Sequence, residues 1–267
     1  MLKKIMNRIK WKSYDLIVFF VKKKKVGNKS KHSFLINTNS AHELNRALTF
    51  YEKEPEMIEW IDGLLKYKIK NDFIFWDIGA NIGIYSLYVA KKYNEAKVFS
   101  FEPESNNFSA LCNNIHLNNF NNVNPFMIGL SNITGYENLQ ISVMSPGAGA
   151  ASIAIPYKYT ISATIFKQGI CISKADDLIK NKIFPIPNFI KIDVDGHERK
   201  ILSGSYDLFA REELLAIMIE LEYVDNDDLN IVISEMIKFG FSLSKVSNWK
   251  DLANDLIIQN FLFERMI

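Results

Sequence analysis

Cysteine is scarce in this sequence of 267 residues, which contains only Cys112 and Cys171. Two cysteines are too few for a disulfide framework or for a thiolate zinc cluster. We therefore expect both to be buried thiols in a reducing compartment, because free cysteine is among the most buried residue types. No H-x-x-x-H or C-x-x-C spacing accompanies the acid-rich stretches, so we predict no metal site; a hard cation held by Asp193 and Asp195 is an alternative that no spacing supports.

Long apolar runs are also absent. The stretch from Leu16 to Val21 is far shorter than the roughly 20 residues that span a bilayer. A secretory signal needs a longer apolar region and a small-residue cleavage site, whereas Lys22 to Lys25 follow here. We therefore expect a cytoplasmic protein.

A large net charge is missing too, because the formal value is only +2. This balance gives no reason to expect nucleic acid as a partner. The segment from Met1 to Lys31 is nevertheless basic. A helix carrying Trp11, Ile17, Phe19 and Phe20 beside these lysines can lie on an anionic membrane surface, or it can be a solvated extension with one face packed on the domain. Sequence alone leaves both interpretations open.

Apolar residues are plentiful enough for a substantial core. Hydrophobic residues make up 48% of the chain and charged residues 23%, a composition typical of globular rather than disordered proteins. The length fits one large α/β domain with an N-terminal extension.

The stretch from Phe73 to Ala90 predicts a strand, a tight turn and a helix. An apolar run ends at Asp77, glycines follow at Gly79 and Gly83, and apolar positions then recur every three to four residues. The glycines permit a sharp turn and leave room for a ligand to lie against main-chain N–H groups near a helix start. We expect a nucleotide-like cofactor with an anionic group here. The third glycine of G-x-G-x-x-G is missing, so the pyrophosphate signature is absent.

Glu102 ends the second predicted strand, residues 97–101, at about the 20-residue spacing at which a carboxylate reaches ribose hydroxyls. Its simpler role is that of an acid at a helix N-terminus.

Residues 123–130 predict a third strand. In a sheet of this type the turn after it passes over the nucleobase, so Ser131 or Asn132 can meet the adenine ring or belong to a plain turn.

The periodicity changes between Thr134 and Ser173. Residues 137–144 alternate with period two, Pro146 to Ala150 interrupt the pattern, and short β-branched pieces follow at 153–155 and 161–165. This predicts an inserted hairpin or small sheet with a mobile glycine-rich tip. Insertions at the rim of a sheet are natural elements for binding substrate.

A second informative stretch, residues 189–199, predicts a fourth strand that ends in acids. Ligands bind at the carboxyl ends of strands in open α/β sheets, so Asp193, Asp195 and His197 should face the same crevice as Gly79 and Glu102. Asp195 and Glu198 also have the spacing of a capping box, which explains them without chemistry. His197 is either a base or a hydrogen-bonded structural histidine.

Helices, a further strand and a strand pair complete the prediction. Helical segments over residues 41–65 should precede the sheet and could cover the cofactor site, with His42 as a surface residue. Residues 214–222 predict a fifth strand and residues 231–239 a helix. Residues 241–246 and 257–263 then predict two final strands, plausible as an antiparallel pair.

Several of these stretches, in this order and spacing, resemble the FkbM-type S-adenosylmethionine-dependent methyltransferases. The matching motifs are Asp77-Ile-Gly-Ala-Asn-Ile-Gly83, Phe101-Glu-Pro103, Asn114-Ile-His-Leu-Asn118, Lys191-Ile-Asp-Val-Asp-Gly-His-Glu198 and Ile219-Glu220. The resemblance covers residues 73–222. The family's usual K-I-D-V-E-G motif has glutamate where this chain has Asp195, so its carboxylate is one methylene shorter.

The resemblance implies a Rossmann-like α/β fold with a seven-stranded mixed sheet, its last strand antiparallel, and helices on both faces. We expect a basic, helical N-terminal extension over residues 1–70 and a methyltransferase domain over residues 71–267, with a β-rich insertion at 133–173 between strands three and four. The implied reaction is O-methylation of a hydroxyl by S-adenosylmethionine, commonly on sugars or secondary metabolites.

Site roles also follow from the resemblance. Asp77, Gly79, Asn81 and Gly83 would hold the methionine part of the cofactor and Glu102 its ribose. Asp193, Asp195 and His197 would lie near the transferred methyl group. An alcohol needs a base as it attacks, for which we expect Asp195 or His197, with Asp193 orienting the substrate.

The acceptor is not specified by any motif. The N-P-P-Y/F motif used on planar amides and bases is absent, and we expect a small-molecule or glycan acceptor, such as a sugar of a surface glycan or glycolipid precursor. The basic N-terminus is compatible with a membrane-bound acceptor. An NAD(P)-dependent oxidoreductase and a non-catalytic Rossmann-like binding module are the competing readings.

Overall fold

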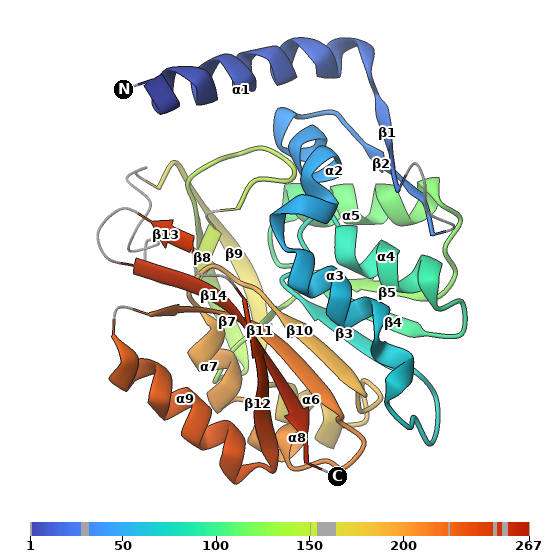
Figure 1. Cartoon of the computed structure of the whole chain (residues 1–267), viewed down its shortest axis with the longest axis vertical. Helices are drawn as coiled ribbons and strands as arrows, with labels where there is room; N and C mark the ends of the chain where they lie inside the picture. Colours follow the sequence, from blue (N-terminus) through green and yellow to red (C-terminus); the bar gives the residue numbers. More distant parts are fainter. Residues whose placement is uncertain are drawn as a thin grey trace.

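The computed structural model describes residues 2–27, 32–149, 151–153, 164–223, 225–247, 250–252 and 256–266. Its central sheet has the strand order β12-β14-β11-β10-β3-β4-β5 (Figure 1). The strands are β3 (Ile74–Ile78), β4 (Lys97–Phe101), β5 (Val123–Phe126), β10 (Phe189–Ile192), β11 (Ala216–Tyr223), β12 (Phe241–Val246) and β14 (Leu256–Arg265). Only β14 runs antiparallel to its neighbours in this order; the short β13 (Lys250–Leu252) pairs with its outer part. The predicted seven-stranded mixed sheet is confirmed.

The sheet is covered on both faces because its strands alternate their side chains between two cores. Phe75 faces one core and contacts Trp60, whereas Trp76 faces the other and contacts Phe101. The first core is closed by α2 (Ala41–Lys53), α3 (Pro55–Asp62), α4 (Ile84–Lys92) and α5 (Ser105–Leu117). The second is closed by α6 (Ala175–Lys180), α7 (Glu198–Ser203), α8 (Tyr206–Phe209) and α9 (Asn226–Lys238).

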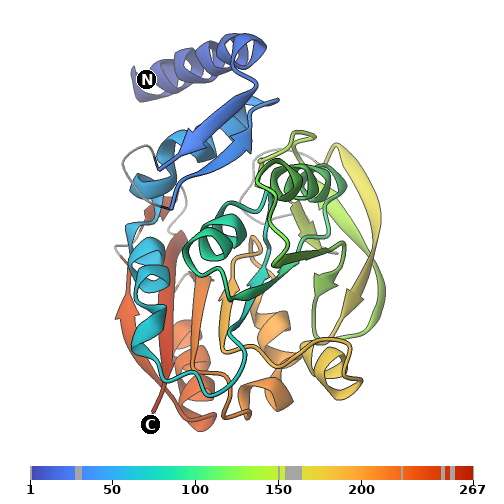
Figure 2. The ribbon, with the colours of Figure 1, turned by 90° about the vertical axis from the view of Figure 1, so that its right-hand side faces the viewer.

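A second, smaller sheet lies between β5 and β10 in the sequence. Its order is β6-β9-β7-β8, with β6 (Gly129–Leu130), β7 (Gly135–Ile141), β8 (Ala151–Ile153) and β9 (Phe166–Ser173). The predicted β-rich insertion is confirmed, and Figure 2 shows it beside the main sheet. The short strand expected at 161–165 lies largely outside the described residues.

The third predicted strand, residues 123–130, is wrong in its extent. The chain turns after Phe126, where the Ile128 N–H donates to the Phe126 carbonyl oxygen at 3.0 Å. Gly129 and Leu130 then pair with β9 in the second sheet. The apolar run is therefore shared between two sheets rather than belonging to one.

The turn that precedes β8 is anchored instead of forming the expected mobile tip. The Ser40 Oγ donates to the Pro146 carbonyl oxygen at 2.6 Å, and the Arg46 Nε donates to the Gly147 carbonyl oxygen at 2.6 Å. The side-chain amide of Asn107 bonds the same turn through the Gly147 N–H at 2.8 Å. These contacts fix residues 146–149 against α2 and α5.

The N-terminal part contains a hairpin that the sequence did not predict. Helix α1 (Leu2–Phe20) leads into the antiparallel pair β1 (Lys23–Val26) and β2 (Phe34–Asn37). Val26, Phe34 and Ile36 are buried in the same core as α4 and the sheet. The helices predicted over 41–65 are confirmed, and α2 begins with a capping box between Ser40 and Glu43.

Two smaller expectations are wrong. His42 is half-buried rather than on the surface, because the Trp11 ring of α1 lies over it with 4.7 Å between the ring centroids. Cys112 is only partly buried and Cys171 is exposed, because Cys171 points outward from β9, whose neighbours Ile170 and Ile172 fill the small core of the insertion.

Candidate active site

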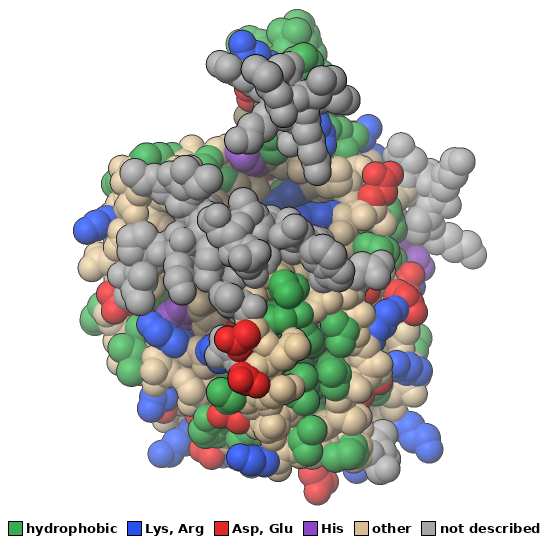
Figure 3. All heavy atoms as spheres, turned by 60° about the vertical axis from the view of Figure 1, so that its left-hand side comes forward, with side chains coloured by type: hydrophobic (Ala, Val, Ile, Leu, Met, Phe, Trp, Pro, Cys, Tyr) green, Lys and Arg blue, Asp and Glu red, His purple; other side chains and the backbone are tan. Residues whose placement is uncertain are grey.

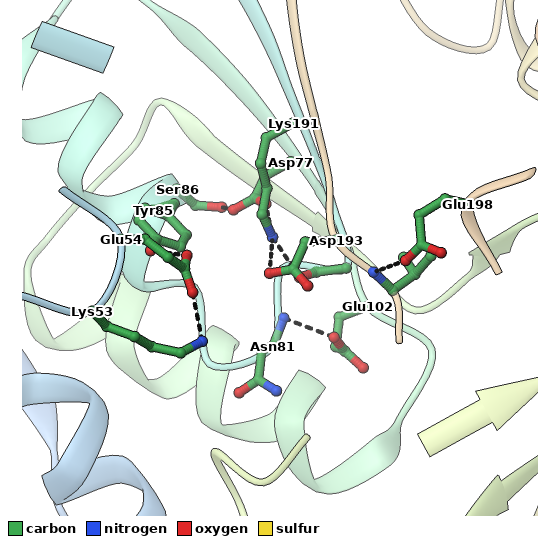
Figure 4. Close-up of polar contacts among 12 residues, drawn as sticks. Lys53, Glu54, Asp77, Asn81, Tyr85, Ser86, Glu102, Lys191, Asp193 and Glu198 are labelled. Atoms are coloured by element: carbon green, nitrogen blue, oxygen red, sulfur yellow. Dashed lines mark hydrogen bonds and ion pairs between the residues drawn. The ribbon is translucent and has the colours of Figure 1, made fainter. Parts of the chain in front are cut away.

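A cavity of about 280 Å³ lies at the carboxyl ends of β3, β4 and β10. Six of the predicted site residues line it: Gly79, Asn81, Glu102, Asp193, Asp195 and His197. The remaining four, Asp77, Gly83, Ser131 and Asn132, do not belong to its lining. The topology therefore brings the cofactor motif and the acid-rich stretch into one crevice, as the strand ends predicted (Figure 4).

The turn after β3 requires glycine for two separate reasons. Gly79 and Gly83 have φ angles of +76° and +84°, which glycine adopts at little cost. A Cβ atom on Gly79 would lie 1.9 Å from the Asp193 carbonyl oxygen, and one on Gly83 would lie 2.3 Å from Leu111 Cδ1. The Gly79 turn thus packs directly on the backbone after β10.

The main-chain N–H groups of this turn do not face a ligand, which corrects the sequence-based interpretation. Those of Gly79 and Ala80 both donate to the Phe101 carbonyl oxygen at 3.0 Å. The Asn81 N–H donates to Glu102 Oε2 at 2.7 Å. These bonds tie the turn to the end of β4 and leave side chains and carbonyl groups to meet a ligand.

Glu102 is buried and lines the cavity. Its second oxygen accepts a hydrogen bond from the Glu104 N–H at 2.8 Å. Burial raises the pKa of Glu102 to about 7, against the opposing effect of these two N–H donors. The helix-capping role belongs instead to Glu104, whose carboxylate accepts from the Asn106 and Asn107 N–H groups at the start of α5.

Asp77 lies behind the turn rather than in the cavity. Its side chain is fully buried and accepts a hydrogen bond from Ser86 Oγ at 2.6 Å. Lys191 Nζ lies 3.3 Å from Asp77 Oδ1 and 3.3 Å from Asp193 Oδ2, and it donates to the Gly79 carbonyl oxygen at 3.0 Å. Burial alone would lower the pKa of Lys191, but the carboxylates of Asp193 and Asp77 outweigh it and raise the pKa above its ordinary value.

His197 is 5% exposed, and its Nε2 lies 3.0 Å from Ser131 Oγ. Ser131 therefore contacts His197 behind the cavity wall, whereas Asn132 is exposed. Burial, helped by the charge of Lys200, lowers the pKa of His197 to about 4. The imidazole is consequently neutral at physiological pH.

The predicted capping box at Asp195 and Glu198 is wrong. Asp195 has a φ angle of +53°, which is incompatible with the extended conformation of an N-cap, and His197 is the residue before α7. Glu198 Oε1 instead accepts from the Val194 and Gly196 N–H groups at 3.1 and 3.2 Å. Burial raises the pKa of Glu198 to about 8, so this buried carboxyl closes the turn that carries Asp195.

The sequence matches the family model described as Methyltransferase FkbM domain over residues 77–243. The chain belongs to the FkbM methyltransferase family. The cofactor of this FkbM methyltransferase is S-adenosylmethionine, which decides against the NAD(P)-dependent oxidoreductase. The predicted family and cofactor are confirmed.

Curated relatives extend over most of this FkbM chain. Hexuronic acid methyltransferase AglP of Haloferax volcanii is 28% identical over 191 residues, which cover 71% of this chain and 73% of AglP. Methyltransferase 1 of Beauveria bassiana is 24% identical over 150 residues, covering 51% and 60%. Among solved structures, a METTL16 MTase domain aligns with a TM-score of 0.48 and 14% identity over 85% of this chain and 81% of that one.

Sequence reasoning did not single out Arg46, Lys53 or Tyr85, which also line the cavity. Arg46 and Lys53 come from α2, and Figure 3 shows Lys and Arg side chains in a hollow below α1. Lys53 pairs with Glu54 at 2.5 Å, and the same carboxylate accepts a hydrogen bond from the Tyr85 hydroxyl. For Arg46 and Lys53 the only signal was the expectation that helices before the sheet cover the site of this FkbM methyltransferase, whereas Tyr85 lies in α4, the helix predicted after the glycine turn.

Proposed function

We propose that this FkbM methyltransferase transfers a methyl group to a hydroxyl oxygen of a sugar. The observation that carries the proposal is that Asp193, Asp195 and Glu102 line one cavity. Asp193 and Asp195 would then face the acceptor hydroxyl, and Glu102 would bind the ribose of the cofactor. AglP acts on a hexuronic acid, as its name states, and its similarity to this chain supports a sugar acceptor.

The cavity residues fit the cofactor. Glu102 offers a buried carboxylate for the ribose hydroxyls, and Ile128, Leu130 and Leu139 give an apolar wall for the adenine ring. Gly79 and Asn81 lie where the methionine part would pass, while Asp77 and Gly83 shape the turn from behind. When bound, the cofactor supplies an activated methyl group on a sulfonium, so the protein's task is to orient the acceptor and exclude water.

We assign the base to Asp195. Its carboxylate lines the cavity beside Gly149, where an added Cβ atom would lie 3.5 Å from Asp195 Oδ2, an ordinary van der Waals distance. We prefer Asp195 to His197 because His197 is only 5% exposed and its Nε2 lies 3.0 Å from Ser131 Oγ, a contact that gives it a structural role. Asp193, paired with Lys191, orients the substrate.

Methyl transfer from radiolabelled S-adenosylmethionine tests this function. We would assay nucleotide-linked and lipid-linked sugars, with and without a uronic acid, on the wild type, Asp195→Asn and His197→Ala. We expect Asp195→Asn to keep cofactor binding by calorimetry and to lose at least about a hundredfold in kcat. Normal turnover of Asp195→Asn would remove the base assignment, and a loss confined to His197→Ala would move it to His197. The absence of transfer to any sugar hydroxyl would remove the sugar proposal.

We further propose that the enzyme works in the cytoplasm, on a precursor held at a membrane face. None of the described helices is long and apolar enough to cross a bilayer. Between residues 2 and 27 the chain carries nine Lys or Arg side chains and one Asp. Such a segment is attracted to the anionic lipids of a membrane surface.

A further inference from the structure

Helix α1 has one face that packs on the protein. Trp11 lies over His42 of α2 with 4.7 Å between ring centroids, Tyr14 contacts Trp11 edge-on, and Val18 is only 8% exposed. Positions 11, 14 and 18 follow the three-to-four-residue spacing of a single helix face. This face fixes α1 on α2.

The opposite face of α1 is apolar and open to solvent. Ile9 is 63% exposed, Leu16 66% and Phe20 81%. Their separations of seven and four residues place them in one stripe along the helix, turned about half a circle from Val18. Among the described residues, no other helix or strand covers this stripe, and Figure 1 shows α1 across the top of the molecule.

Positive charge borders the stripe. Lys10 and Lys12 are exposed on its two sides, and Lys22 and Lys23 follow at the end of the helix. An apolar stripe flanked by lysines matches a lipid surface with acidic head groups, where apolar side chains enter the acyl boundary and ammonium groups meet the phosphates. A second copy of this chain packed on the same stripe would bring like-charged lysines close to one another.

We propose that the stripe of Ile9, Leu16 and Phe20 docks this enzyme on an anionic phospholipid surface. Since α1 lies on α2 and α2 lines the cavity with Arg46 and Lys53, docking places the cavity at the end of the molecule that faces the lipid. An acceptor carried on a lipid then reaches the acids of β10 without leaving the membrane. This last step rests on the proposed function, whereas docking itself does not.

Vesicle flotation tests the docking surface in the full-length protein. The vesicles contain phosphatidylcholine alone or with phosphatidylglycerol. We expect the wild type to float only with phosphatidylglycerol and to be released by high salt. The variant Leu16→Glu with Phe20→Glu should bind at least about tenfold less. A matched control carries Leu65→Glu with Ile183→Glu, which changes the charge equally at side chains 65% and 59% exposed elsewhere, and it should float like the wild type.

Two outcomes would overturn the docking surface. One is equal flotation of the wild type and the α1 variant. The other is a stable dimer by light scattering that the α1 variant dissociates, without any flotation of the wild type. Circular dichroism and cofactor binding establish that the variants fold. Flotation is measured without turnover, so a failure of methyl transfer to sugars would leave this result standing.

Discussion

The ammonium group of Lys191 donates a hydrogen bond to the carbonyl oxygen of Gly79 at 3.0 Å, from a side chain that is 2% exposed. The same nitrogen lies 3.3 Å from carboxylate oxygens of Asp77 and Asp193. One buried cation therefore joins the end of β3, the glycine turn of residues 79–83 (the cofactor turn) and the first acid after β10. The shape of the cavity floor depends on this cation.

Replacing Lys191 by methionine should strongly destabilise the fold. The change leaves the carboxylate of Asp77 buried without its cation, which typically costs about 3–5 kcal/mol. Urea unfolding measures the loss. Lys97→Met is the control, because the Lys97–Asp72 pair is exposed and its loss should change the free energy of unfolding by less than about 1 kcal/mol. Similar losses in both variants would contradict a structural role for the buried pair.

Gly79→Ala should weaken cofactor binding. The added Cβ atom would lie 1.9 Å from the Asp193 carbonyl oxygen at a φ angle of +76°, so the turn and the backbone after β10 must separate. We expect at least a tenfold weaker affinity for S-adenosylmethionine by calorimetry, about 1.4 kcal/mol or more. Gly169→Ala, where no atom lies within 4 Å of the added carbon, should bind as the wild type does. Unchanged binding by Gly79→Ala would mean that the turn is not part of the site.

Arg46 should favour acceptors that carry a carboxylate. Its Nε is committed to the Gly147 carbonyl oxygen, which orients the remaining guanidinium donors at the cavity wall, and carboxylates accept such donors in pairs. Arg46→Ala should lower kcat/KM for a uronic acid acceptor by about tenfold or more and that for the matching neutral hexose much less. Arg46→Lys keeps the positive charge, and its kcat/KM for the uronic acid acceptor should lie between the values of the wild type and Arg46→Ala. If Arg46→Ala lowered kcat/KM equally for both acceptors, the role of Arg46 would be limited to holding the Gly147 turn.

Stability should fall as the pH rises through the neutral range. The pKa of Glu198 in the folded state, about 8, lies above its ordinary value of 4.5, so the folded state binds this proton more tightly than the unfolded state. The contribution of Glu198 to the free energy of unfolding is then undiminished below about pH 4.5 and decreases as the pH rises toward 8, whereas the lowered pKa of His197 acts in the opposite direction only below about pH 6.5. Glu102, with a pKa of about 7, acts in the same direction.

The variant Glu198→Gln separates the contribution of Glu198 from that of the remaining groups. Its amide oxygen can still accept from the Val194 and Gly196 N–H groups but does not titrate. Urea unfolding at several pH values should show a smaller decrease from acidic to alkaline pH than in the wild type, by on the order of a few kcal/mol. Glu52→Gln, at an exposed position of α2, should follow the wild type. If the free energy of unfolding of Glu198→Gln decreased with pH as steeply as that of the wild type, the Glu198 carboxyl would not be the cause of the decrease.

The centre of the sheet was predictable because β3, β4, β10 and β11 are apolar runs with an acid at or just beyond the end. Residues 74–78 are buried along their whole length, as a continuous apolar run indicates, and the final antiparallel pair has its own alternation. The prediction of a single strand over residues 123–130 was wrong, because hydrophobicity does not show where a chain passes from one sheet to another. The strand β1, with the sequence Lys-Lys-Lys-Val, shows no apolar alternation at all.

Parts of the site depend on contacts that are distant in sequence. The N–H groups of Gly79 and Ala80 are taken by Phe101, and no local pattern near the glycines shows this partner. The spacing of Asp195 and Glu198 fits a capping box until Asp195 adopts a positive φ angle. Arg46 and Lys53 belong to the site because α2 presents that side to the cavity, an orientation set by packing.

Asn114 joins the N-terminal hairpin to the cofactor turn. Its Oδ1 accepts from the Asn37 N–H at 2.9 Å, and its Nδ2 donates to the Ile82 carbonyl oxygen at 3.0 Å, from a side chain with no exposed surface. A fragment that starts at residue 71 would lose the hairpin and open this amide to solvent beside the cofactor turn. We therefore expect the rest of the enzyme to fold in soluble form only when the hairpin of β1 and β2 is present. N-terminally shortened versions of the chain should start no later than residue 23.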